Sequence, residues 1–132
     1  MTENKPPLVL VLLSDRPQRV YPALFMATGV AEMGHHVIVK IAAEGVNIVK
    51  KDHKMDPMPG IRTIDESFAY LKSLGVELIA CGMSWELLKM AGVTEDTAKP
   101  NIVLNAGPDC LKDCFRDAFR EAPNGGLFVV ID

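Results

Sequence analysis

The chain has few cationic residues and no cluster of them. Its 132 residues include 14 Lys and Arg against 17 Asp and Glu, so the formal net charge is −3. Neutralisation of phosphates dominates affinity for nucleic acids, so a mildly acidic chain without a basic cluster is a poor nucleic-acid binder. We therefore expect no nucleic-acid partner.

Long hydrophobic runs and paired cysteines are also missing. The apolar run at 8–13 is too short to span a bilayer or to serve with its flanks as a signal peptide, and residues 1–7 before it are polar and expected to be flexible. We expect no membrane span and a cytoplasmic location, where thiols are normally reduced. Three cysteines are an odd count, which excludes a fully paired disulfide framework.

The chain further lacks the motifs of several common α/β chemistries. Ser14-Asp15-Arg16-Pro17 follows the first apolar run, where a dinucleotide site needs G-x-G-x-x-G, and no Walker A loop occurs. Cys81 follows the third run in place of the acceptor aspartate of a receiver domain. Leu87 stands where a cysteine phosphatase needs an arginine. These classes are excluded.

Strand-like and helix-like patterns alternate along the chain. The continuous aliphatic run at 8–13 is typical of a strand buried on both faces. Strands are expected at 8–13, 36–42, 76–80, 101–104 and 126–131. Helices are expected at 21–33, 44–50, 64–74, 84–91 and 108–122, with loops at 14–19 and 51–60. This order predicts one α/β domain over residues 1–132, a three-layer sandwich with about five mainly parallel strands.

Ligands of such sheets bind beyond the carboxyl ends of the strands, near a topological switch point. The rule selects as binding candidates the residues that follow the expected strands: Ser14, Asp15, Glu44, Gly82, Met83, Ser84, Gly107 and Cys110. Lone carboxylates such as Asp15 and Glu44 are otherwise often helix-capping or solvated residues.

Cys81 is the candidate with chemistry of its own. It lies between an expected strand and a helix that begins at Ser84, with Gly82 beside it. Unpaired N–H groups and the positive end of a helix dipole stabilise a thiolate, so we expect a thiol pKa below the free value of about 8.5. The alternative is a small buried hydrophobe that closes the strand, since free cysteine is among the most buried residue types.

The other two cysteines lie one turn apart on the expected helix 108–122. Cys114 adjoins its apolar stripe and is interpreted as core packing, whereas Cys110 lies in the first turn, at the same sheet edge as Cys81. No C-x-x-C pair or neighbouring histidine supports a metal site, so no metal and no cofactor are expected. His35 and His36 are interpreted as structural, and His53 as a loop side chain.

The chain resembles the DsrE/DsrF-like sulfur-relay family, which includes subunits of the DsrEFH and TusBCD complexes. The similarity includes segments at 20–25, 31–41, 44–51 and 54–60, and its most specific part is 75–84 (GVELIACGMS), which continues to 91–93. Members with this pattern carry a sulfur-binding cysteine at the position of Cys81. The resemblance implies a parallel sheet, trimers or hexamers, and transfer of persulfide sulfur between protein thiols.

The sequence thus predicts a sulfur carrier, sulfurtransferase-like if catalytic, that holds sulfane sulfur on Cys81 and has sulfur donor and acceptor proteins as partners. One alternative is a non-enzymatic ligand-binding or assembly module of the same fold with an inert Cys81. Another is a redox switch that pairs Cys81 with Cys110, which requires Cα atoms within about 7 Å.

Overall fold

The computed structural model describes residues 5–81, 97–105, 116, 120 and 125–132. The elements in chain order are β1 (Leu8–Leu12), α1 (Pro17–Glu32), β2 (Val37–Ile41), the 3₁₀ helix η1 (Ala43–Val49), α2 (Ile64–Ser73), β3 (Glu77–Cys81), β4 (Val103–Asn105) and β5 (Leu127–Ile131).

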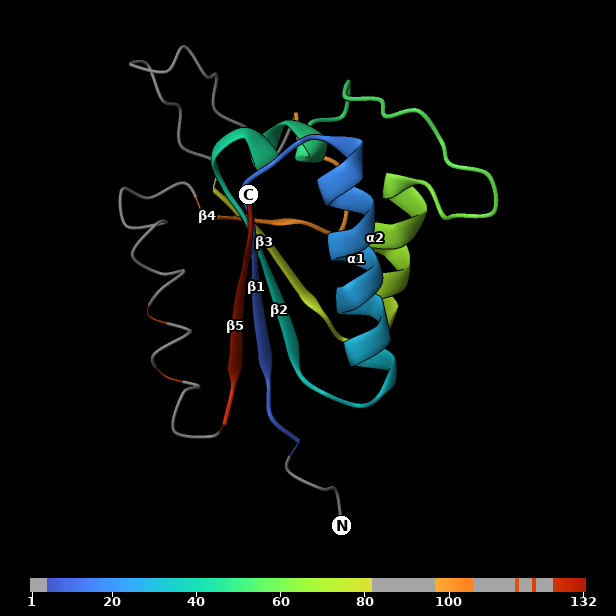
Figure 1. Ribbon diagram of the computed structural model, residues 1–132. Coiled ribbons are helices and arrows are strands. Elements are labelled where there is room, and N and C mark those ends of the chain that lie inside the picture. The colour runs from blue at the N-terminus through green and yellow to red at the C-terminus, as the bar shows by residue number, and fades with distance from the viewer. Residues whose placement is uncertain (1–4, 82–96, 106–115, 117–119, 121–124) are drawn as a thin grey trace.

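The five strands form one sheet in the order β4-β3-β2-β1-β5, and every neighbouring pair is parallel (Figure 1). All residues of the inner strands β1 and β2 are buried, which explains the continuous aliphatic sequence of β1 and the aliphatic sequence of β2 apart from Lys40. The predicted α/β fold with a five-stranded parallel sheet is confirmed. The carboxyl ends of all strands meet at one edge, which also carries η1.

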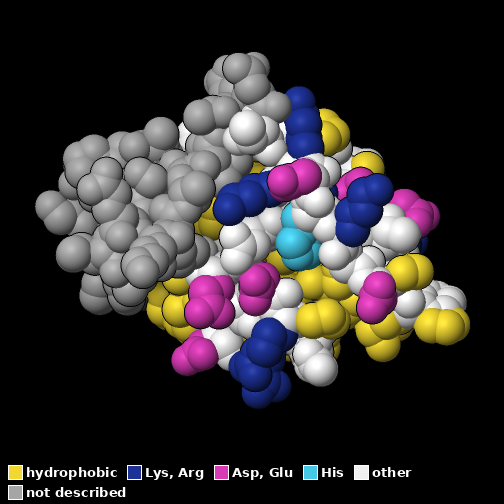
Figure 2. Space-filling model, turned by 90° about the horizontal axis from the view of Figure 1, so that it is seen from above, with side chains coloured by type: hydrophobic (Ala, Val, Ile, Leu, Met, Phe, Trp, Pro, Cys, Tyr) yellow, Lys and Arg dark blue, Asp and Glu magenta, His cyan; other side chains and the backbone are white. Residues whose placement is uncertain are grey.

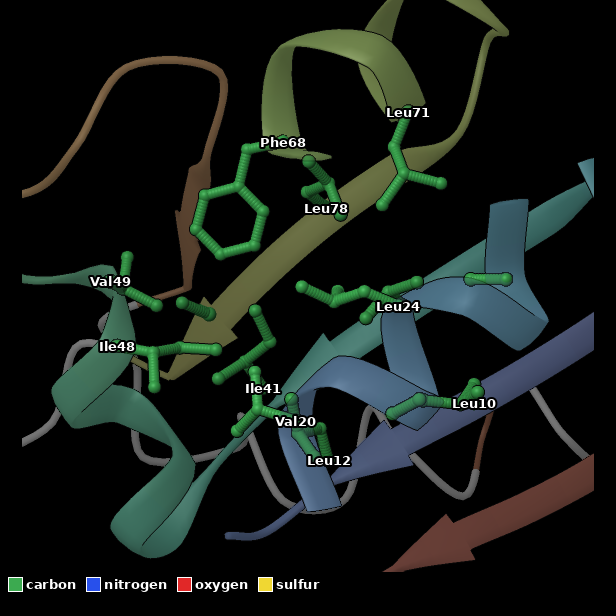
Figure 3. Packing of buried hydrophobic residues seen from close by; sticks show 14 of the residues in the cluster. Leu10, Leu12, Val20, Leu24, Ile41, Ile48, Val49, Phe68, Leu71 and Leu78 are labelled. Carbon is green, nitrogen blue, oxygen red and sulfur yellow. The ribbon is translucent and has the colours of Figure 1, made fainter. Parts of the chain in front are cut away.

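Helices α1 and α2 cover one face of the sheet (Figure 1). Alternate strand residues point to this face and pack against both helices and η1. Figure 3 shows the resulting core, whose largest fully buried side chains include Phe68, Leu10, Leu12, Ile41 and Ile48. The helix expected at 108–122 falls outside the described residues except for Arg116 and Arg120, which are helical.

Helix α1 begins four residues earlier than its apolar pattern predicts. Pro17 occupies the start of the helix, where its fixed φ suits the first turn and its missing N–H costs nothing. The Arg16 carbonyl accepts from the N–H groups of Arg19 and Val20 at 2.9 Å and closes that turn. The loop predicted at 14–19 is therefore wrong for its second half. Pro22, which would fall in the first turn of the helix predicted at 21–33, lies inside α1.

Other boundaries differ by one or two residues. Strand β3 includes Cys81 as its last residue, opposite Asn105 of β4, so Cys81 belongs to the strand and does not follow it. Strand β4 begins only at Val103, because Asn101 has a left-handed φ of 73°. The short helix expected at 44–50 is η1, whereas the helix expected at 84–91 lies outside the described residues.

Helix α2 begins where the sequence places it. The Thr63 hydroxyl accepts from the Glu66 N–H at 3.2 Å, and the Glu66 carboxylate accepts from the Thr63 N–H at 3.3 Å, which forms a capping box. The segment between η1 and α2 contains no helix or strand, as the loop prediction for 51–60 requires. In the part of the chain that the structure describes, no helix combines the length and apolar character needed to cross a membrane.

Candidate functional site

Cys81 ends β3 at the carboxyl edge of the sheet. Its neighbours are β2 on one side, where Ala80 pairs with Ile41, and Asn105 of β4 on the other. The side chain is only 4% exposed. Its sulfur is in a disulfide bond. The other two cysteines of the chain, Cys110 and Cys114, lie outside the described residues.

The disulfide differs from the reduced thiol that the sequence led us to expect. A disulfide sulfur is an electrophile, and a nucleophilic thiolate forms at Cys81 only after two-electron reduction. The expected helix start at Ser84, with Gly82 and Met83 before it, also lies outside the described residues. The sheet therefore fixes the position of the sulfur, and its chemical state depends on the redox conditions.

A cleft of about 650 Å³ opens at the same edge, beyond β1, β2 and β5. It lies at the topological switch point, since the chain leaves β1 toward β2 on one side and returns to the other side of β1 as β5. The residues that line it are Leu13, Ser14, Asp15, Arg16, Ala43, Glu44, Asn47 and Asp132.

Three binding candidates from the sequence, Ser14, Asp15 and Glu44, thus line one cleft. Cys81 does not line it: β3 lies two strands away from β1, which is about 10 Å at the usual strand spacing. Gly107 and Cys110, also candidates, fall outside the described residues. The carboxyl edge accordingly carries two separate features, the Cys81 sulfur and the cleft.

Hydrogen bonds hold the cleft wall together. Asn47 Nδ2 donates to Asp15 Oδ2 at 3.0 Å, and Lys50 Nζ donates to Asn47 Oδ1 at 3.1 Å. Ser14 is buried, and its hydroxyl accepts from the Arg16 N–H at 3.1 Å. Asp15 is therefore not a lone solvated carboxylate, because it ties the turn after β1 to η1.

A mixed cluster of charges surrounds His53 next to this wall. The Lys99 side chain is 6% exposed, and its Nζ lies 3.2 Å from Asp65 Oδ1. Burial lowers the pKa of His53 below its ordinary value of 6.5, and the nearby Lys99 charge lowers it further. Figure 2 shows a histidine among Lys or Arg and Asp or Glu side chains on the face seen from above. Among the described residues, the buried Nδ1 of His53 has no hydrogen-bond partner.

The lowered pKa of His53 predicts a stability change with pH. Because the folded state disfavours protonation, the unfolded state binds more protons below about pH 6.5, and the free energy of unfolding falls as the pH decreases. We expect His53→Asn to reduce this fall in urea titrations at pH 5 and pH 7.5. The control is His35→Asn, which removes an imidazole at the opposite edge of the sheet and shows how far such a substitution alone changes the free energy of unfolding. An unchanged pH dependence in His53→Asn would contradict the prediction.

The remaining histidines lie at the amino edge of the sheet. His36 Nε2 is 2.8 Å from Glu77 Oε2, and His35 Nδ1 is 2.6 Å from the Pro6 carbonyl oxygen. These contacts tie β2 to β3 and to the N-terminal segment. No group of three or more His, Cys, Asp or Glu side chains that could hold a metal ion occurs within the described ranges.

Sequence reasoning missed Asn47 and Lys99. Asn47 lies one turn after Glu44, so a search for polar residues within η1 would have found it. Lys99 had no local signal, because an antiparallel bridge between Lys50 and Ala98 brings its segment to the edge from a distant part of the chain. The bond from Lys99 N to the Val49 carbonyl, at 2.7 Å, extends this pairing.

Comparison with known proteins supports the fold and identifies the family. No curated protein matches the chain. The crystal structure of the ychN protein from E. coli is similar with a TM-score of 0.61 and 7% sequence identity, over 95% of this chain and 99% of that one. At this identity the likeness concerns the fold alone. The DsrE/DsrF-like family matches residues 8–112, which is most of the chain and includes Cys81. The chain is therefore a member of the DsrE/DsrF-like family.

Proposed function

We propose that the protein is a sulfur carrier, which accepts sulfane sulfur on Cys81 as a persulfide and passes it to a partner thiol. The observation that carries the proposal is the position of Cys81, at the end of a central parallel strand on the edge where such sheets bind their ligands. Membership of the DsrE/DsrF-like family, which is generally linked to sulfur relay, supports it.

The transfer needs one nucleophile and no redox cofactor. The Cys81 thiolate attacks the terminal sulfur of a donor persulfide, a new S–S bond forms, and the donor thiolate leaves with the electron pair of the broken bond. In the second step an acceptor thiolate attacks the terminal sulfur of the Cys81 persulfide. The electron pair of that bond then returns to Cys81, which is regenerated as a thiolate.

The disulfide sets a condition for this cycle. A dithiol reductant must first reduce the bond at Cys81, supplying two electrons and two protons, because the oxidised sulfur has no thiolate to attack a persulfide. The low exposure of Cys81 restricts access to small donors or to a protein donor that docks at the edge. We propose that sulfur donor and acceptor proteins dock there and that the chain assembles with copies of itself.

Intact-mass spectrometry of the reduced protein after incubation with a persulfide donor tests the proposal. We expect adducts of about +32 mass units per sulfur on the parent chain and much less on Cys81→Ser, because the substituted hydroxyl forms no persulfide and only the thiols of Cys110 and Cys114 remain. The matched control is Cys114→Ser, which also removes one thiol and is expected to load like the parent. Equal loading of Cys81→Ser and the parent would refute the role of Cys81.

A second candidate function is binding of a small ligand in the cleft with an inert Cys81. The cleft at the switch point favours it, because Ser14, Asp15 and Glu44 line that cleft and Cys81 does not. The same experiment distinguishes the two functions. A reduced parent chain that takes up no sulfur supports the binding module, whereas an adduct confined to Cys81 supports the carrier. The cytoplasmic location stays a prediction of the sequence.

A further inference from the structure

Lys40 is a charged residue in the middle of a buried strand. It occupies the fourth position of β2, between Val39 and Ile41, and is only 5% exposed. Burying an ammonium group is costly, and lysine is rarely found inside unless the charge is paired. Lys40 does have an interaction partner within the folded chain. None of the steps proposed for sulfur transfer uses it.

The register of the sheet places Lys40 on the same face as Cys81. Lys40 pairs with Ile79 of the adjacent parallel strand β3, and Cys81 lies two residues farther along that strand. Paired residues and residues two apart share a face, so the register places Lys40, Ile79 and Cys81 on the face opposite α1 and α2. As the last residue of β3, Cys81 also borders the core cluster on the helix side. At ordinary strand spacing and rise, the Cα atoms of Lys40 and Cys81 are about 8 Å apart.

Few other charged side chains of the described strands lie on the sheet face opposite α1 and α2. The neighbouring positions in β1 and β2 are the buried apolar residues Val9, Val11 and Ile38. Glu77 at the amino end of β3 is the one carboxylate among the described strand residues on this face, and His36 binds it at 2.8 Å. Glu77 lies four residues from Cys81, whereas Lys40 is its diagonal neighbour.

We propose that Lys40 is a positioning residue whose ammonium charge stabilises the anionic sulfur of Cys81, both as thiolate and as persulfide. This inference rests on the proposed function of Cys81. The Cα atoms of Lys40 and Cys81 are about 8 Å apart, and a lysine side chain with its flexible four-carbon stem is long enough to bring its ammonium group close to the sulfur. Because the surroundings are apolar and buried, the attraction is screened less than at the surface. A lysine close to a cysteine favours its thiolate form.

The test is the titration of the Cys81 thiol in a Cys110→Ser/Cys114→Ser background under reducing conditions, followed by the ultraviolet absorbance of the thiolate. We expect Lys40→Met to raise the midpoint by about one pH unit, so that the ratio of thiolate to thiol at a given pH falls about tenfold. Lys40→Arg keeps the charge and is expected to titrate like the parent. Lys51→Met, which removes an exposed lysine of the same edge, is the matched control and is expected to leave the midpoint unchanged.

A second measurement needs no substitution of Lys40, in case Lys40→Met fails to fold. The ¹³Cε resonance of Lys40 is expected to shift as Cys81 titrates, and this shift is expected to vanish in Cys81→Ser. A folded Lys40→Met with the parent midpoint, or a Lys40 resonance that ignores the Cys81 titration, would overturn the inference. These readouts do not depend on sulfur transfer. A shifted midpoint without any sulfur adduct would therefore refute the carrier function alone.

Discussion

Replacement of Phe68 by alanine is expected to lower the free energy of unfolding by about 3–5 kcal/mol. Phe68 is 1% exposed and is among the largest fully buried side chains. It extends from α2 toward Leu78 of β3 and the end of η1, where Ile48 and Val49 belong to the same core cluster (Figure 3). Truncation removes the transfer free energy of the ring and leaves a cavity that α2, β3 and η1 cannot all move to fill.

Urea denaturation of the parent and the variant measures this loss. Phe25→Ala on α1 is the matched control, because the Phe25 side chain is 50% exposed, and a change within about 0.5 kcal/mol is expected there. A loss below about 1 kcal/mol in Phe68→Ala would contradict the packing described for this core. The effect bears on function because Phe68 fixes η1 and β3 relative to each other, and both end at the edge that carries Cys81.

The sheet was predictable because every residue of β1 and β2 lies in the same kind of environment, the buried interior. Residues of β1 and β2 are buried on both faces, so β1 appears in the sequence as an unbroken aliphatic run and β2 as a run that only Lys40 interrupts. The start of α1 was not predictable in the same way. Pro17 and Pro22 each suit a first helical turn, and only the hydrogen bonds to the Arg16 carbonyl decide between them.

Some residues of the candidate site could be predicted from the local sequence, and others reach it only through pairing with distant segments. Ser14, Asp15 and Glu44 lie two or three residues beyond the ends of β1 and β2, so the rule for strand ends finds them from the sequence alone. Lys99 reaches the edge because its N–H bonds the Val49 carbonyl and the Lys51 N–H bonds the Thr97 carbonyl, and this pairing leaves no periodic pattern in the sequence. Lys40 was hidden because it interrupts an aliphatic strand by one residue and its face follows only from the register with β3.

Cys81 combines a predictable position with an unpredictable chemical state. The strand before it and the family pattern around it indicate the edge of the sheet, which is where β3 ends. Its disulfide depends on which residues lie opposite in three dimensions, and spacing along the sequence does not determine that distance. The sequence therefore predicts where the sulfur lies, and the fold decides whether another sulfur lies close enough to pair with it.

Gly45→Ala is expected to destabilise the protein by about 1–3 kcal/mol and to disturb the cleft wall. A Cβ atom at Gly45 meets the Leu12 carbonyl oxygen at 2.6 Å and the Leu12 carbonyl carbon at 3.2 Å. Both atoms are backbone of a buried strand, so they cannot rotate away as a flexible side chain does. The Gly45 N–H also bonds the Leu13 and Ala42 carbonyls, which keeps η1 against the end of β1.

The matched control for this variant is Gly29→Ala in the last turn of α1, where an added Cβ has no atom within 4 Å. The same methyl group is expected to stabilise the protein there by about 0.5–1 kcal/mol, because alanine is the better helix former. In urea titrations, the unfolding midpoint should therefore be lower than that of the parent for Gly45→Ala and higher for Gly29→Ala. The Asn47 side-chain amide resonance should shift only in Gly45→Ala, since its bond to Asp15 joins η1 to the turn after β1. If Gly45→Ala matches Gly29→Ala in stability, η1 does not approach β1 as closely as the 2.6 Å contact requires.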